Sequence, residues 1–284
     1  MSAAGETAAG GGEYPGRPQA ASGHRHPDGH RRIAAAFAGH DRSAALMPYL
    51  MGGFPDLEAS RAAGLACADA GADLIELGIP FSDPLADGPV IHAAATEALG
   101  AGVTPDDVLG VCESVAARVP VVLMVYANAV EAAGREAFVA RAAASGAAGL
   151  IVPDLPNDEA GELRAACDAG GLALVPLAAP TTPAERLERI AADARGFVYT
   201  VSLSGTTGER ERLPEDLSDT VARVRAVASV PVAVGFGVST PEQAALVAEL
   251  ADGVIVGSRV VRAAGEGGPE AVGDLVEQLA AALT

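Results

Sequence analysis

The sequence predicts one α/β domain of the (β/α)8 barrel class, a TIM barrel, behind a disordered N-terminal extension. From Ile33 onward, short β-branched or aliphatic runs alternate with alanine-rich segments of helical spacing, as in repeated βαβ units. About eight such runs in about 250 residues match the usual size of such a barrel. An open doubly wound sheet is the main rival, but no Gly-x-Gly-x-x-Gly motif follows an early strand.

The extension is expected to span residues 1–30 and the barrel residues 31–284. The extension combines glycine, proline and polar residues without a hydrophobic period, which is typical of disorder. It contains His24, His26 and His30, for which a solvated tail is favoured over a metal site. We therefore expect no metal in this chain.

Composition excludes several classes of protein. Nineteen basic and thirty-seven acidic residues give a net charge of −18, which repels nucleic acid and anionic lipid. The three cysteines, Cys67, Cys112 and Cys167, are interpreted as buried free thiols in a reducing compartment. No uncharged run is suited to cross a bilayer, and the extension lacks the apolar stretch of a secretory signal. We expect a cytoplasmic protein.

Strands and helices can be placed in order along the barrel. The expected strands are 44–51, 73–77, 121–126, 148–152, 172–177, 196–201, 231–235 and 252–256. Thr104, Thr182 and Thr240 each precede a proline and are predicted helix N-caps. Glycines expected in the left-handed region between a helix and the next strand are Gly71, Gly146, Gly170 and Gly171.

The second strand carries Glu76 within the apolar run Leu74–Leu77. A charged group inside such a strand costs several kcal/mol unless it is paired or neutral. A structural carboxylate at the barrel mouth, paired with arginine or amides, is the alternative to a proton-transfer group. A second carboxylate, Asp87, follows in a proline-rich loop and could instead cap the helix that starts at Pro89. Two carboxylates in different surroundings can divide acid and base roles.

Two further sets of residues follow late strands, where barrels place their chemistry. The segment 202–214 after the sixth strand is long and rich in glycine, serine and threonine at its start, and is interpreted as a lid, although a mobile loop without a role remains open. Tyr199 near that strand's end could face the mouth or simply pack. Gly235-Phe236-Gly237 and Gly257-Ser258 follow the last two strands and predict a phosphate site of backbone N–H groups.

These residues together resemble the tryptophan synthase alpha chain family. The resemblance covers about residues 33–284 and rests on Leu74–Gly88, Tyr126-Ala127-Asn128, Val152–Pro156, Ala179-Pro180-Thr181, Ser202–Gly208, Gly235–Gly237 and Gly257-Ser258. It implies the cleavage of indole-3-glycerol phosphate into indole and glyceraldehyde 3-phosphate. So many ordered matches are far more specific than a shared fold.

The resemblance implies a role for each site residue. Glu76 would be the acid and base, with a pKa raised towards neutrality by burial. Asp87 would stabilise the indole N–H, and Tyr199 would lie near the reacting centre. The expected indole pocket is Tyr49, Tyr126, Ile151, Leu177 and Phe236, although any barrel core needs residues such as Ile151 and Leu177. The expected phosphate ligands are Gly208, Gly237 and Ser258, with Gly257 shaping the turn.

The resemblance further implies a partner. A beta chain that carries pyridoxal phosphate would receive indole in an α2β2 assembly, with no cofactor in this chain and contacts from loop 80–88 and the third strand region. Two departures bear on the pocket and the lid: Met51-Gly52-Gly53 replaces the usual turn after the first strand, and Leu203 stands where some relatives carry arginine.

Three alternatives stay open at this point. The chain could be a stand-alone lyase that releases indole, or a phosphosugar isomerase of similar barrel type. It could also be a catalytically silent barrel that binds phosphate ligands and activates a partner. The intact Glu76 and Asp87 pair argues against the last two.

Overall fold

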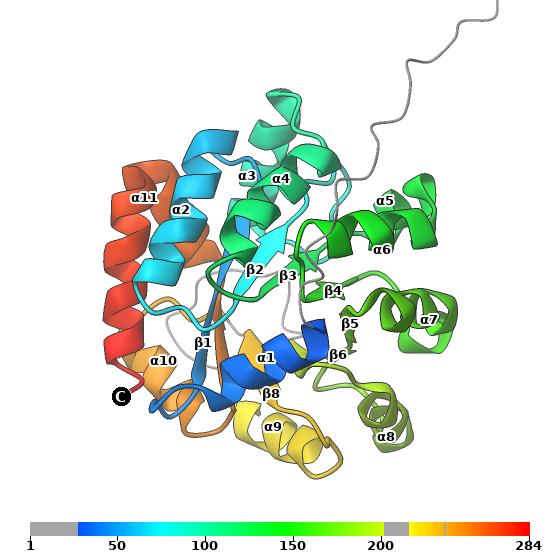
Figure 1. Ribbon diagram of the computed structural model, residues 1–284. Coiled ribbons are helices and arrows are strands. Elements are labelled where there is room, and N and C mark those ends of the chain that lie inside the picture. The colour runs from blue at the N-terminus through cyan, green and yellow to red at the C-terminus, as the bar shows by residue number, and fades with distance from the viewer. Residues whose placement is uncertain (1–27, 202–215, 236) are drawn as a thin grey trace, which may run out of the picture.

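Parallel strands form a ring that helices surround in a computed structural model, which describes residues 28–201, 216–235 and 237–284 (Figure 1). Hydrogen-bonded neighbours follow the order β5-β4-β3-β2-β1-β9-β8-β7-β6. The strands of the described residues are β1 (Ala45–Met51), β2 (Ile75–Gly78), β3 (Val121–Met124), β4 (Gly149–Ile151), β5 (Ala173–Val175), β6 (Leu177–Ala178), β7 (Val198–Val201), β8 (Val232–Gly235) and β9 (Gly253–Val256). Each predicted strand overlaps an observed one, which confirms the barrel class.

The chain itself closes the ring, at Pro176. The two ends of the strand order, β5 and β6, are neighbours in sequence: Val175 pairs with β4, and Leu177 pairs with Tyr199 of β7. Proline has no N–H to donate, but the carbonyl of Pro176 accepts a bond of 3.0 Å from the Tyr199 N–H. The predicted strand 172–177 is therefore divided into β5 and β6, which together occupy one of the eight strand positions of the barrel.

Helices follow most strands and cover the outside of the ring. The helices of the described residues are α1 (Gly29–Ala38), α2 (Leu57–Asp69), α3 (Pro89–Gly100), α4 (Pro105–Ala116), α5 (Ala127–Ala133), α6 (Arg135–Ala144), the 3-10 turn η1 (Asn157–Glu159), α7 (Gly161–Gly170), α8 (Ala184–Asp193), α9 (Leu217–Arg225), α10 (Pro241–Ala248) and α11 (Ser258–Ala281). None of them is long and apolar enough to cross a membrane.

Two of three predicted N-caps are confirmed. Thr104 forms a capping box with Asp107, and the Thr240 hydroxyl accepts from the Gln243 N–H. The prediction for Thr182 is wrong, because its hydroxyl accepts from the Ala179 N–H in the preceding turn and α8 begins one residue later, after Pro183. At the other helix ends, Gly71, Gly146 and Gly171 adopt positive φ as expected, whereas Gly170 is the last residue of α7.

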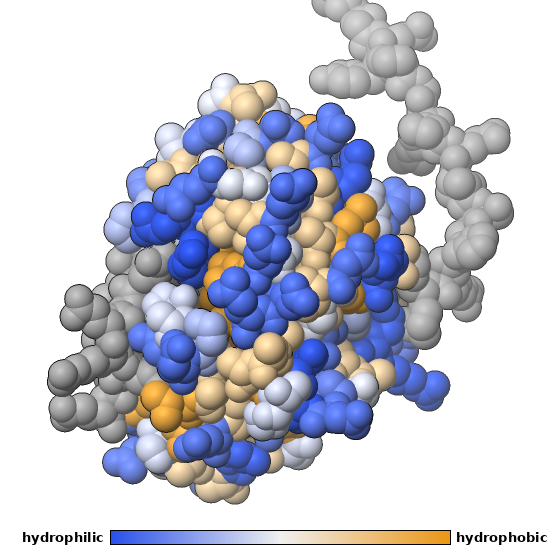
Figure 2. All heavy atoms as spheres, turned by 90° about the vertical axis from the view of Figure 1, so that its left-hand side faces the viewer, coloured by the Kyte–Doolittle hydropathy of each residue, from blue (hydrophilic) through white to orange (hydrophobic). Residues whose placement is uncertain are grey.

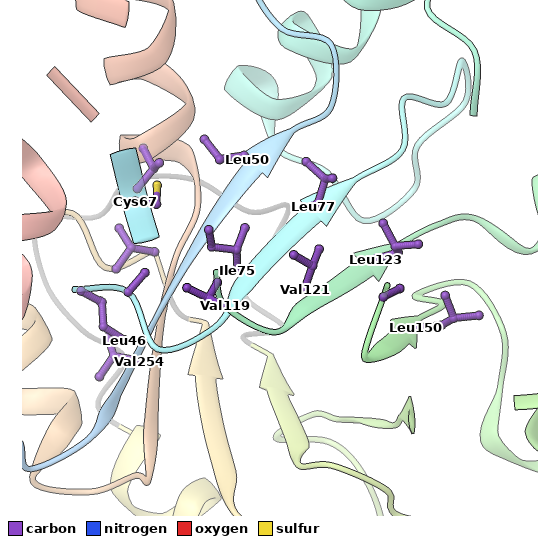
Figure 3. Packing of buried hydrophobic residues seen from close by; sticks show 14 of the residues in the cluster. Leu46, Leu50, Cys67, Ile75, Leu77, Val119, Val121, Leu123, Leu150 and Val254 are labelled. Atoms are coloured by element: carbon purple, nitrogen blue, oxygen red, sulfur yellow. The ribbon is translucent and has the colours of Figure 1, made fainter. Parts of the chain in front are cut away.

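Alternate residues of the strands face opposite sides of the ring wall. Figure 3 shows Leu46 and Leu50 of β1, Ile75 and Leu77 of β2, and Leu123 of β3 within the outer core between strands and helices. All three cysteines are buried free thiols in this layer, as predicted. Seen from the side of α2 and α11, polar side chains are spread over the outer surface between small apolar areas (Figure 2). The apolar faces of these helices therefore point inward.

Helix α1 covers the end of the ring at which the strands begin. Ile33 is buried in the inner cluster, and the Phe37 ring lies 5.6 Å from that of Phe197. Arg32 donates to the carbonyls of Gly146 (2.6 Å), just after α6, and of Ala116 (2.7 Å), the last residue of α4. The helix starts at Gly29, so residues 29 and 30, which were assigned to the extension, are helical, and residues 1–27 lie outside the described residues.

We predict that Arg32→Ala destabilises the protein. The substitution leaves carbonyls at two helix ends without a charged donor, so the free energy of unfolding should fall by about 2 kcal/mol. For a protein of this size the melting temperature should fall by about 4–8 °C in thermal unfolding followed by circular dichroism. Arg31→Ala, on the exposed side of the same helix, is the matched control. Equal melting temperatures for the two variants would contradict the assigned role.

Candidate active site

Strand alternation turns Glu76 into the ring. Its neighbours Ile75 and Leu77 face the helices, so the carboxylate between them faces the interior. Glu76 pairs with Tyr49 of β1 and Val122 of β3, and it is only 2% exposed. A strand that reads as apolar thus carries one acidic group into the space enclosed by the ring.

Burial controls the chemistry of Glu76. Neither of its carboxyl oxygens has a hydrogen-bond partner among the described residues, and no cation of that part of the chain influences its pKa. The loss of water, followed by the negative charge of Asp87, raises the pKa of Glu76 to about 8. The group is therefore mostly protonated at neutral pH. A structural role that needs arginine or amide partners finds no support in these contacts.

Asp87 does not cap the next helix. Helix α3 starts at Pro89 with Gly88 as its N-cap, and no side chain caps it. Burial raises the pKa of Asp87 to about 6, while a hydrogen bond from the Tyr126 hydroxyl and the charge of His92 oppose this rise. Asp87 is consequently ionised at neutral pH where Glu76 is protonated. The two environments separate the pKa values of the two carboxyl groups, as an acid and a base require.

Two buried tyrosines complete the polar part of the site. The pKa values of Tyr49 and Tyr199 rise well above the usual value because both are buried and both lie near the charges of Glu76 and Asp87. Glycines on neighbouring strands make room for their hydroxyls. A Cβ on Gly78 would lie 2.1 Å from the Tyr49 oxygen, and one on Gly235 would lie 2.5 Å from the Tyr199 oxygen.

The expected apolar residues also face the interior. Ile151 of β4 is fully buried in the inner cluster, and Leu177 of β6 packs against it. Met124 of β3, which was not predicted as a site residue, packs against this cluster and against the one around Tyr49. The inward alternation of Val122 and Met124 along β3 is the signal that could have found it.

Three of the predicted phosphate-binding residues, Gly237, Gly257 and Ser258, follow the ends of β8 and β9. Gly237 has a φ of 72°, and Gly257 precedes α11, whose first residue is Ser258. The first N–H groups of a helix have no partner within it. A Cβ on Gly257 would lie 3.8 Å from the Cβ of Tyr49, so this helix start adjoins the tyrosine pocket. The whole of the predicted lid 202–214, with Leu203 and Gly208, lies outside the described residues, as do Phe236, His24 and His26.

Within residues 28–201, 216–235 and 237–284, no three His, Cys, Asp or Glu side chains gather as a metal site. The buried groups described above are instead suited to proton transfer on an organic substrate.

Comparison with known proteins identifies the family. The family model described as tryptophan synthase alpha chain matches residues 36–282. The chain belongs to this family. It is 50% identical to the alpha chain of Gloeobacter violaceus over 252 residues, which cover 87% of this chain and 91% of that one. It is 51% identical to the alpha chain of Prochlorococcus marinus over 221 residues, which cover 77% and 80% of the two chains.

Solved structures support the same family assignment. Tryptophan synthase of Mycobacterium tuberculosis superposes with a TM-score of 0.84 at 42% identity, and the match covers 89% of this chain and 98% of that chain. As a member of this family, the chain is a lyase subunit of tryptophan biosynthesis that cleaves indole-3-glycerol phosphate for a beta chain. An isomerase is thereby excluded.

We predict that Glu76→Gln stabilises the fold at alkaline pH. Because the pKa of Glu76 is raised in the folded chain, the unfolded chain releases this proton first. Native stability is therefore lost as pH rises from 4.5 to about 8. The neutral amide avoids this loss, on the order of several kcal/mol.

Melting temperatures of the native chain and the variant should agree near pH 4.5 and differ by several degrees at pH 9. Glu97→Gln, on the exposed face of α3, removes the same charge in water and serves as the control. Parallel stability curves for Glu76→Gln and the native chain would show that the carboxyl is not held neutral by burial.

Proposed function

We propose that Glu76 performs the proton transfers of indole-3-glycerol phosphate cleavage and that Asp87 stabilises the charged intermediate. The observation that carries this proposal is the buried and mostly protonated carboxyl of Glu76, which has no hydrogen-bond partner among the described residues, beside an ionised Asp87. A neutral acid inside a pocket can donate a proton to carbon only if no stronger partner already holds it.

The reaction needs two proton transfers. Protonation of indole C3 by Glu76 places a positive charge on the ring, mainly at N1, where the Asp87 carboxylate stabilises it. The C3–C1′ bond then breaks and its electron pair restores the indole ring, while the C1′ hydroxyl loses its proton to the Glu76 carboxylate and becomes the aldehyde. Glu76 ends protonated again, so the cycle balances without another reagent.

Other side chains would bind the substrate. Tyr199 would lie near the reacting centre, where burial keeps its hydroxyl protonated. Tyr49, Tyr126, Ile151, Leu177 and Phe236 would enclose the indole ring. Backbone N–H groups at Gly208 and Gly237 and at the start of α11, with Gly257 and Ser258, would hold the phosphate. These N–H groups would attract the phosphate locally, although the net charge of −18 repels it at long range.

The lyase assay tests these roles. Glu76→Gln retains the shape of the side chain but cannot transfer protons, so indole formation should fall by about 10²–10⁴-fold with the fold intact. Asp87→Asn should also lower kcat severely, because the charge on N1 loses its counterion. Both are measured by indole release from purified protein, with Glu97→Gln as the control. Activity of Glu76→Gln within about tenfold of the native rate would refute the assignment.

We further infer an α2β2 assembly, located in the cytoplasm, in which a pyridoxal phosphate-bearing beta chain receives the indole. Alpha chains of this family work with a beta chain. The loop between β2 and α3 offers a contact surface, because Leu85 is 82% exposed only two residues from Asp87. A partner that covers Leu85 would therefore act close to the proposed site.

We predict that Leu85→Asp weakens association with a beta chain. A buried charge at an interface is costly, so co-purification should decrease and the stimulation of indole formation by added beta chain should fall by about tenfold or more. Leu246→Asp places the same change on α10, where Leu246 is 52% exposed, and should have no effect. A native mixture that elutes as separate chains in size-exclusion chromatography with light scattering would contradict the assembly.

A further inference from the structure

Loop 79–88 carries Asp87 and lies against Tyr126. The Phe81 ring stacks on the Tyr126 ring with centroids 4.9 Å apart and planes inclined by 20°. Near the other end of the loop, the Ala86 N–H donates to the Tyr126 hydroxyl at 3.2 Å. One buried side chain thus contacts both ends of a loop that exposes Ser82, Asp83 and Leu85 between them.

The Ala86 bond orients the Tyr126 hydroxyl. A backbone N–H can only donate, so the phenol oxygen accepts from Ala86 and its own hydrogen is free to point elsewhere. The adjacent carboxylate of Asp87 takes this hydrogen bond. The hydroxyl therefore links the loop backbone to the Asp87 side chain.

Tyr126 itself is held rigidly. It is 3% exposed and directly follows Val125, whose N–H donates to Ile151 of β4 at 3.0 Å. The next residue, Ala127, donates to the Asp154 carboxylate at 2.8 Å. Two neighbouring strands and the loop after β4 thus determine where the phenol lies.

We propose that Tyr126 is a positioning residue of the lyase reaction, whose ring and hydroxyl hold loop 79–88 so that the Asp87 carboxylate faces Glu76. This inference rests on the role proposed for Asp87. It gives the Tyr126 hydroxyl a task distinct from enclosing the indole ring, because the hydroxyl acts through Asp87.

The charged and titratable groups around Asp87 determine the sign of the expected pH effect. Tyr126 and His92 of α3 favour the ionised form, whereas burial opposes it; Glu76, Tyr49 and Tyr199 also lie within reach of the Asp87 charge. Removing the Tyr126 hydroxyl removes one stabilising bond from the carboxylate. The pKa of Asp87 should then rise above about 6, and the acid limb of kcat/KM should move to higher pH.

The test is Tyr126→Phe in the full chain, which keeps the ring and its stacking on Phe81. We expect kcat to fall by about tenfold with little change in KM, and the acid limb to shift to higher pH. Combined with Asp87→Asn, the second substitution should add almost nothing, because both act on one interaction. Ser114→Ala removes a hydroxyl bond on α4 away from the site and is the matched control.

Hydrogen exchange supplies a readout that does not depend on activity. Amide exchange across 79–88 should be faster in Tyr126→Phe than in the native chain or in Ser114→Ala, since Ala86 loses its acceptor. Unchanged exchange with an unchanged pH profile, or effects that simply add to those of Asp87→Asn, would overturn the positioning role. A native chain without lyase activity would refute the proposed function, while the exchange result would still decide whether Tyr126 holds the loop.

Discussion

The burial of the Glu76 carboxyl without a partner is the constraint on which the site depends. An inward position on β2 removes the group from water, and in the described part of the chain no cation or amide compensates it. The carboxyl responds by retaining its proton, with a pKa of about 8. The same feature that weakens the fold at alkaline pH makes the group a usable acid at neutral pH. Stability is thus exchanged for reactivity at one residue, and the large aliphatic core around the ring tolerates the loss.

The rest of the site is arranged around this group by the geometry of the ring. Tyr49 lies beside Glu76 in the register of β1 and β2, and Tyr199 reaches the same space from β7. Their hydroxyls fit only because Gly78 and Gly235 have no side chain. Asp87 lies in the loop after β2, is less deeply buried than Glu76, and has partners that Glu76 lacks in the described part of the chain, the Tyr126 hydroxyl and His92. Two chemically similar carboxyl groups thereby hold opposite protonation states at neutral pH.

The phosphate site proposed at the start of α11 illustrates how local structure can oppose the global charge. A protein of net charge −18 repels anions at long range. The first N–H groups of α11 have no partner within the helix, and this helix start lies beside Gly257 and adjoins the Tyr49 side chain. Short-range dipoles of this kind would act on a phosphate bound at the proposed position, while the distant carboxylates are screened by salt. The overall acidity therefore bears on nonspecific partners rather than on the substrate.

Local patterns in the sequence were sufficient to predict the barrel class, the strand positions, the caps at Thr104 and Thr240, and the choice of Glu76. A charge in an apolar strand and a proline after a threonine can be recognised without knowledge of any distant contact. The tertiary structure alone decided three matters: the division of the fifth strand at Pro176, the diversion of the Thr182 hydroxyl to Ala179, and the pairing of Asp87 with Tyr126. Each of these depends on which group is nearest in space and takes the available hydrogen bond. For Asp87, the local sequence allowed either a helix cap or a site residue. Only the closed ring brings the phenol of Tyr126, about forty positions away in the sequence, within reach of Asp87.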